Sequence, residues 1–232
     1  MIMPSDRDYK DTKLIRQGKR FLETPFKELA EWINKEFSVS VLNIYYDVIK
    51  PSDRPRLNVV FEFINDEFKF KNGEAGGYNE DKQKIIATKF KELIKNYKPT
   101  EKNWFQKLFN ISTNEFDTYN IWVTFASFEY VAKQEAGGNI PDREIQKLKT
   151  KLNDKNIWEI SNSSGYLTIF YYTETQAIKN TGIIERVRNE FFEIISQYNE
   201  FNYFTKDNLF IFLDSKENFD KNYDSNWYYY YK

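Results

Sequence analysis

Apolar side chains along this chain recur at two spacings, and the two spacings alternate in a regular order. Helical spacing of three or four residues predicts helices over about 26–37, 86–97, 142–152 and 184–198. Alternation with a period of two predicts strands over about 42–48, 57–63, 121–132, 157–160, 166–172 and 209–213. Each half of the chain therefore reads helix, strand, strand, helix, strand.

This order of elements predicts an α+β fold with predominantly antiparallel sheet, built from two related halves. Short turns at Lys50–Pro55 and Ser161–Gly165 join the first two strands of each half, which indicates antiparallel hairpins. We expect an N-terminal arm over residues 1–20, a first half over 21–138 and a second half over 139–232. A further short helix is predicted after Thr100.

A repeated tetrapeptide gives a second, competing register for a duplication. Glu74-Ala75-Gly76-Gly77 recurs as Glu135-Ala136-Gly137-Gly138. Neither copy continues into the Gly-Lys-Ser or Gly-Lys-Thr of a phosphate-binding loop. We therefore interpret both as tight strand-to-helix turns, which glycine permits.

The residue types exclude several kinds of catalysis. The chain has no His and no Cys, yet it carries 21 Phe, 17 Tyr and 5 Trp in 232 residues. Ser-His-Asp and Cys-His triads, thiol redox chemistry and the common structural zinc sites are therefore excluded. Large amphipathic side chains are enriched at protein interfaces. We expect a non-enzymatic protein that binds another protein and needs no cofactor or metal.

The charge balance narrows the choice of partner. With 34 basic and 35 acidic residues, the net charge of −1 gives no general attraction to nucleic acid or to anionic lipid. The apolar runs are too short for a transmembrane helix, and residues 1–20 lack the apolar stretch of a signal peptide. We expect a cytoplasmic protein without disulfides, and the abundance of Lys, Asn, Ile, Phe and Tyr is typical of an AT-rich bacterial genome.

One acidic pattern offers an alternative function. Asp53 precedes a predicted strand, and Glu67 and Lys69 follow that strand as acid-x-Lys. Metal-dependent nucleases use such residues, because carboxylates hold Mg²⁺ and a lysine assists the attacking water. A solvated strand edge explains the same residues, so the nuclease is the alternative hypothesis.

A second acidic segment follows the last predicted strand. Its carboxylates could in principle bind Ca²⁺, but the EF-hand spacing is absent and lysines interleave. A solvated loop is the simpler interpretation. The residues concerned are Asp214, Glu217, Asp220 and Asp224, with Lys216 and Lys221 between them.

The C-terminal segment holds five consecutive aromatic residues, Trp227 and Tyr228–Tyr231. We predict that Asp214–Lys232 is ordered, that Trp227 is partly buried, and that the segment forms a final strand. In a strand, Tyr229 and Tyr231 would share one face and Tyr228 and Tyr230 the other. The candidate partner-binding residues are Asp220, Tyr223, Asp224, Trp227, Tyr228 and Tyr230.

The last fifty residues resemble bacterial immunity proteins and antitoxins of the small α+β kind. The resemblance rests on the predicted helix Ile184–Tyr198, the apolar stretch Asn208–Ser215 and the acidic, aromatic run through Phe219, Asp220, Tyr223 and Trp227. It implies a protein that blocks a toxin by direct binding. A structural or oligomeric scaffold subunit is a further alternative.

Overall fold

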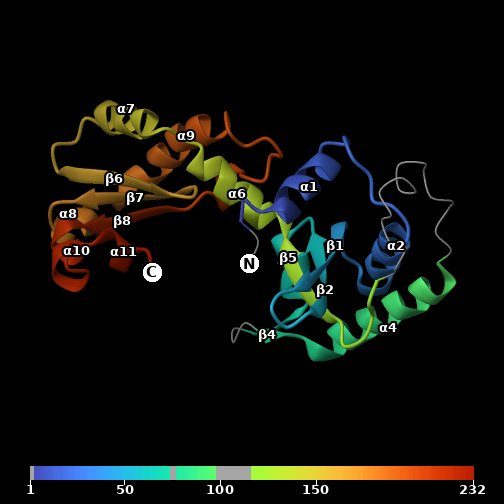
Figure 1. The fold of residues 1–232 in the computed structure, drawn as a ribbon. Helices are drawn as coiled ribbons and strands as arrows, with labels where there is room; N and C mark the ends of the chain where they lie inside the picture. The colour runs from blue at the N-terminus through green and yellow to red at the C-terminus, as the bar shows by residue number, and fades with distance from the viewer. Residues whose placement is uncertain (1–2, 74–76, 98–115) are drawn as a thin grey trace. The chain divides into compact units, whose positions relative to one another are not determined.

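The computed structural model describes residues 3–73, 77–97 and 116–232, and the chain divides into two compact units, Met1–Tyr130 and Val131–Lys232 (Figure 1). Helices and strands alternate in both units, which confirms the α+β class. The units divide after Tyr130, whereas the sequence placed the boundary after residue 138. The short helix predicted after Thr100 lies outside the described residues.

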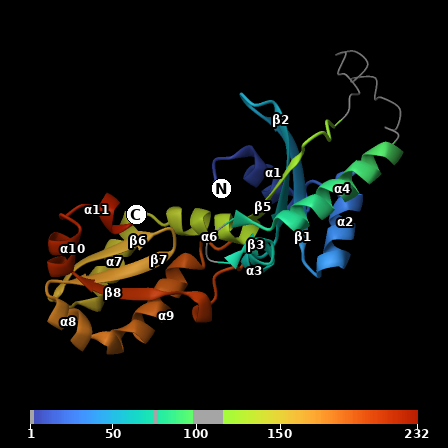
Figure 2. The same ribbon diagram turned by 90° about the horizontal axis from the view of Figure 1, so that it is seen from below.

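The first unit is built on a three-stranded sheet in the order β1-β2-β5, in which β1 and β2 are antiparallel and β2 and β5 are parallel. Helices α2 and α4 supply the core on one face, and α1 packs against β1 from the other face (Figure 2). The elements are α1 (Arg7–Arg16), α2 (Phe26–Phe37), β1 (Val41–Ile49), β2 (Arg54–Phe61), α3 (Ile64–Phe68), β3 (Lys71–Asn72), β4 (Gly77–Tyr78), α4 (Glu80–Asn96), β5 (Trp122–Ser127) and the start of α6 (Phe128–Gly138).

The second unit repeats this plan with the sheet order β6-β7-β8, again antiparallel and then parallel. Helices α7 and α9 cover one face, while α10 and α11 lie on the other (Figure 1). The elements are α7 (Asp142–Leu152), β6 (Ile157–Ser163), β7 (Tyr166–Tyr171), α8 (Glu174–Lys179), the 3₁₀ turn η2 (Thr181–Ile183), α9 (Ile184–Ile195), the 3₁₀ turn η3 (Lys206–Asn208), β8 (Ile211–Ser215), α10 (Lys216–Asn222) and α11 (Trp227–Tyr230).

The third strand of each unit ends in the same Ser-x-Glu motif. Ser127 and Ser215 end β5 and β8, and each hydroxyl accepts the N–H three residues on, at the start of the following helix. The glutamate two residues after each serine accepts the first N–H of the short helix behind the middle strand: Ile64 donates to Glu129 (3.1 Å) and Glu174 to Glu217 (3.2 Å). The same residue types thus satisfy the same helix termini in both units, which supports two related halves.

The N-terminal segment differs from the expected arm because it contains helix α1. Tyr9 is 2% exposed and stacks on Phe128, with ring centroids 5.2 Å apart. Thr12 is fully buried, and its hydroxyl accepts from Asn43 Nδ2 at 2.9 Å. The sparse apolar positions of this helix gave no amphipathic signal, since polar contacts carry much of its packing.

The strand predicted over 121–132 ends at Ser127, where α6 begins. Its alternating aromatics favoured a strand, but Ser127 caps a helix instead. Residues 135–138 therefore lie in α6 and form no strand-to-helix turn. A Cβ on Gly137 would lie 2.0 Å from the Gly165 nitrogen, so glycine there allows the helix to approach the β6–β7 turn.

The C-terminal segment is ordered as two short helices, so the predicted final strand is wrong. Asn226 caps α11 by accepting the Tyr228 N–H at 2.9 Å, and helical spacing replaces strand alternation. Trp227 is partly buried, as predicted, with 39% of its surface exposed. The predicted pairing of Tyr228 with Tyr230 on one face is lost with the strand.

Candidate functional site

The face of the β6-β7-β8 sheet opposite α7 and α9 carries a compact aromatic cluster. Trp227 stacks on Trp158 of β6, with centroids 5.9 Å apart and planes 5° from parallel. Phe219 of α10 approaches Trp227 at 4.3 Å, and Phe170 of β7 lies 5.3 Å from it. These rings dock the C-terminal helices on the end of the sheet formed by Trp158, Phe170 and Asp214.

Two hydroxyl groups fix the last turn of the chain on this face. Tyr230 donates to Asp214 Oδ2 at 2.6 Å, and Tyr231 donates to Ser161 Oγ at 2.6 Å. Burial, reinforced by the Asp214 carboxylate, raises the pKa of Tyr230 far above its ordinary value. Ser161 pairs across the sheet with Thr168, and Thr168 pairs with Phe212. The tail therefore covers the sheet only as far as this middle row.

From Phe212 in that row onward, the same face is open and aromatic. Tyr166 is 48% exposed, Phe210 56% and Phe212 48%, although all three belong to or directly precede regular strands. Phe210 and Phe212 stack at 6.5 Å, and both sit on the face opposite the buried Leu209 and Ile211. An aromatic surface of this kind is typical of a protein contact. We call the surface formed by Tyr166, Phe210 and Phe212 the open aromatic face.

The six residues predicted to bind a partner have different surroundings in the structure. Asp220 pairs with Lys216 and accepts from Ser225, and the bond from Lys216 lowers the pKa of its carboxyl. Tyr223 packs against Tyr230 at 4.8 Å, and Trp227 and Tyr230 face the aromatic cluster. Tyr228, 67% exposed, points to solvent, and Asp224 occupies a left-handed turn with φ of 51°.

Sequence reasoning missed the open aromatic face. The signal was present, because Leu209 to Leu213 was predicted as a strand and its even-numbered residues had to face the other side. The five consecutive aromatics favoured the C-terminal segment as the binding surface instead. Three of those tail rings, those of Trp227, Tyr230 and Tyr231, pack on their own unit.

The alternative nuclease residues are not brought together. Asp53 lies in the turn before β2 and pairs with Lys50, whereas Glu67 lies in α3 beyond the far end of that strand and pairs with Lys71 at 2.7 Å. A strand of this length separates them by about 25 Å. Lys69 is engaged by Asp66 at 2.8 Å. Across the described residues, no group of three or more carboxylates is arranged to hold a metal ion.

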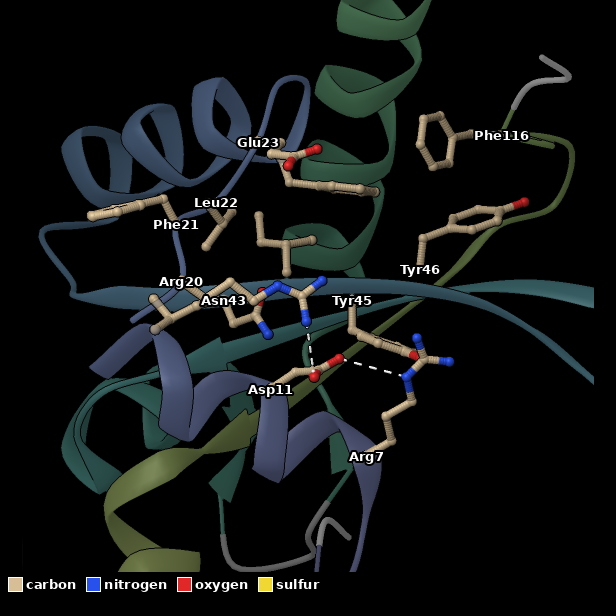
Figure 3. A pocket seen from close by; sticks show the side chains of 13 residues that line it. Arg7, Asp11, Arg20, Phe21, Leu22, Glu23, Asn43, Tyr45, Tyr46 and Phe116 are labelled. Carbon is tan, nitrogen blue, oxygen red and sulfur yellow. Dashed lines mark ion pairs between the residues drawn. The ribbon is translucent and has the colours of Figure 1, made fainter. Parts of the chain in front are cut away.

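The first unit contains a cavity of about 400 Å³ between α1, β1 and the segment before α2 (Figure 3). Arg7 and Arg20 converge on Asp11, at 3.6 and 2.9 Å, and Asn43 and Tyr45 of β1 face the same space (Figure 3). Both guanidinium groups thus share one carboxylate and already have an ionic partner. We therefore rank this cavity below the open aromatic face as a candidate.

No helix in the described ranges combines the length and the apolar character needed to cross a lipid bilayer. Comparison of the chain with models of known protein families finds no match. Comparisons with curated proteins and with solved structures likewise find no match.

Proposed function

We propose that this protein binds another protein, and that a helix of the partner lies on the open aromatic face of the second unit. The observation that carries the proposal is the half-covered sheet: one end of the face is covered by the aromatic tail, while Tyr166, Phe210 and Phe212 remain about half exposed.

The first unit indicates which kind of element a partner would place on this side of the sheet. Register pairs Phe61 with Ser127 and Tyr171 with Ser215, so the side of the sheet under α1 corresponds to the side that carries the open aromatic face. In the first unit, α1 lies over Asn58, the counterpart of Thr168, whereas Arg56 and Trp122, the counterparts of Tyr166 and Phe210, border a cavity beside its N-terminal turn. A helix is therefore an occupant that the equivalent side of the first sheet accepts.

The size of the surface is consistent with an anchor for a partner. Each large aromatic side chain offers roughly 150–250 Å², and about half of each of the three is exposed, which gives an apolar patch of about 300 Å². Patches of this size on soluble proteins are often functional. Aromatic residues, Phe and Tyr among them, are enriched at interfaces, and a few well-packed residues near the centre carry most of the binding energy.

The resemblance to immunity proteins names the first partner class to test, a bacterial toxin. On this proposal the protein acts by occupying a surface and not by catalysis. The nuclease alternative predicts that plasmid DNA is cleaved with Mg²⁺ and that Glu67→Ala abolishes cleavage. We expect intact plasmid with both proteins, because Asp53 and Glu67 are held at opposite ends of β2.

Site-specific photo-crosslinking tests the proposal in cells of the source organism. A photoreactive phenylalanine replaces Phe212, and in the matched control it replaces Phe68, which is 59% exposed in the first unit. We expect one discrete heterologous protein crosslinked at 212 and not at 68. Equal labelling at both positions would contradict the proposal. A product consisting only of a second copy of this chain would support the scaffold alternative, which light scattering would confirm.

A further inference from the structure

The first unit has its own opening at the position that corresponds to the open aromatic face. Arg56 and Trp122 are the counterparts of Tyr166 and Phe210 when Phe61 is matched with Tyr171. Instead of an apolar surface, a cavity of about 330 Å³ lies there, beside the N-terminal turn of α1. Its wall includes Asp8, Arg56, Asn58, Tyr78, Trp122 and Thr124.

The floor of this cavity is a chain of buried polar groups. Asn58 is 4% exposed and Thr124 is 5% exposed. Thr124 donates to Asn58 Oδ1 at 3.1 Å, and Asn58 donates in turn to Asp8 Oδ2 at 3.0 Å. The chain therefore positions the Asp8 carboxylate firmly at the cavity wall.

The cations around the cavity are already used elsewhere. Arg56 binds Asp47 with two parallel hydrogen bonds, and Arg7 pairs with Asp11 and lies over the Tyr45 ring. Asp8 forms no ion pair within the described residues; its hydrogen-bond donor is the uncharged Asn58 amide. The cavity thus presents a carboxylate whose charge no side-chain cation balances at contact distance.

Two aromatic rings stand in the same wall. Tyr78 and Trp122 have centroids 6.5 Å apart, and the Tyr78 hydroxyl is held by the Phe125 carbonyl at 3.3 Å. The Trp122 ring already attracts one cation, Arg54, at 5.8 Å, although Arg54 does not line this cavity. A carboxylate beside aromatic faces is the arrangement that recognises an organic ammonium group.

We propose that this cavity binds an alkylammonium group, with Asp8 as its counter-ion and Trp122 and Tyr78 as its aromatic walls. The site is independent of the protein-binding face of the second unit. Two sources share this chemistry: a small free amine and the side chain of an exposed lysine in a peptide.

The state of Asp8 agrees with this role. Burial raises the pKa of its carboxyl above the ordinary value, although the Asn58 hydrogen bond and the nearby positive charge of Arg56 oppose the shift. The folded protein therefore holds this charge at a cost, which a bound cation would offset. Carboxylates kept in unfavourable surroundings inside a cavity are characteristic of functional sites.

The test is an NMR titration of the full chain, followed through the side-chain amide of Asn58, which reports on Asp8 directly. The probes are n-butylammonium chloride and the peptide acetyl-Gly-Lys-Gly-amide. The matched negative probes are sodium butyrate and the same peptide with norleucine in place of lysine. The test variant is Asp8→Asn, which keeps an acceptor for Asn58, and the control variant is Asp81→Asn, an exposed carboxylate of α4.

We expect saturable shifts with at least one ammonium probe, at least tenfold weaker binding by Asp8→Asn, and binding within twofold of wild type by Asp81→Asn. Tighter binding of the peptide would assign a lysine side chain, and tighter binding of butylammonium would assign a free amine. The proposal is overturned if neither ammonium probe saturates wild-type protein, if butyrate or the norleucine peptide binds equally well, or if Asp8→Asn, checked for folding by its melting curve, binds like wild type.

Discussion

Replacing Trp227 with alanine should destabilise the second unit measurably. The ring is 39% exposed and contacts Trp158, Phe170 and Phe219. If a tryptophan offers about 250 Å², roughly 150 Å² is buried, and 25 cal/mol per Å² gives an upper bound of about 4 kcal/mol. Residual compactness of the unfolded chain lowers that bound, so we expect about 3 kcal/mol.

For a unit of about a hundred residues, this loss corresponds to a melting temperature lower by about 14 °C. Circular dichroism measures it: the far-ultraviolet signal gives the transition, and the near-ultraviolet signal reports the stacked Trp158–Trp227 pair. Tyr228→Ala is the matched control, because Tyr228 lies in the same helix with 67% of its surface exposed. We expect the control to shift by less than about 2 °C. A Trp227→Ala protein that melts with the control would refute the docked tail.

Further substitutions, at Gly137, at Tyr171 and at the two capping serines, test the packing within each unit. Gly137→Ala should lower the free energy of unfolding by about 1–3 kcal/mol, measured by thermal unfolding, because its Cβ would meet the backbone of the β6–β7 turn. Gly138→Ala has open space around its Cβ and should not destabilise the protein. Equal effects of the two substitutions would contradict the close approach of α6 to this turn. Tyr171→Phe should stabilise by about 1 kcal/mol, because the buried Tyr171 hydroxyl has no hydrogen-bond partner among the described residues. Burial raises the pKa of Tyr171 to about 12, so the wild type should lose stability as the pH rises from 10 to 12 and the variant should lose less; parallel pH profiles would count against this. Ser127→Ala and Ser215→Ala should each cost about 1 kcal/mol in chemical denaturation if the two serines cap equivalent helices, and a silent variant would break the equivalence.

The repeated order of helices and strands could be predicted from the sequence because apolar spacing records which face of each element is buried. The hairpins followed from short turns. The direction of β5 and β8 could not be predicted from such turns. A helical crossover returns the chain to the end of the sheet at which the middle strand begins, and it leaves no local signal in the third strand itself. Tertiary contacts also determined the C-terminal segment: five aromatics have high strand propensity, but Asn226 caps a helix and Trp227 stacks on Trp158.

The candidate site could be predicted only in part. Sequence reasoning chose an aromatic surface in the second half of the chain, which also carries the open aromatic face, but it assigned the tail and not the strand positions Phe210 and Phe212. Exposure of those two rings depends on how far the tail reaches across the sheet, and no local pattern encodes that distance. The alkylammonium cavity was not predictable, because Asp8 and Asn58 are fifty residues apart and a hydrogen bond brings them together.

The most direct test of the proposed function is the affinity for the crosslinked partner, measured by calorimetry with purified proteins. The double variant Phe210→Ala/Phe212→Ala removes the centre of the open aromatic face, and Phe68→Ala removes an equally exposed ring elsewhere. Loss of central aromatic anchors costs about 2 kcal/mol or more, so we predict binding at least thirtyfold weaker for the double variant. We predict unchanged binding for Phe68→Ala. Affinity of the double variant within twofold of the wild type would contradict the account.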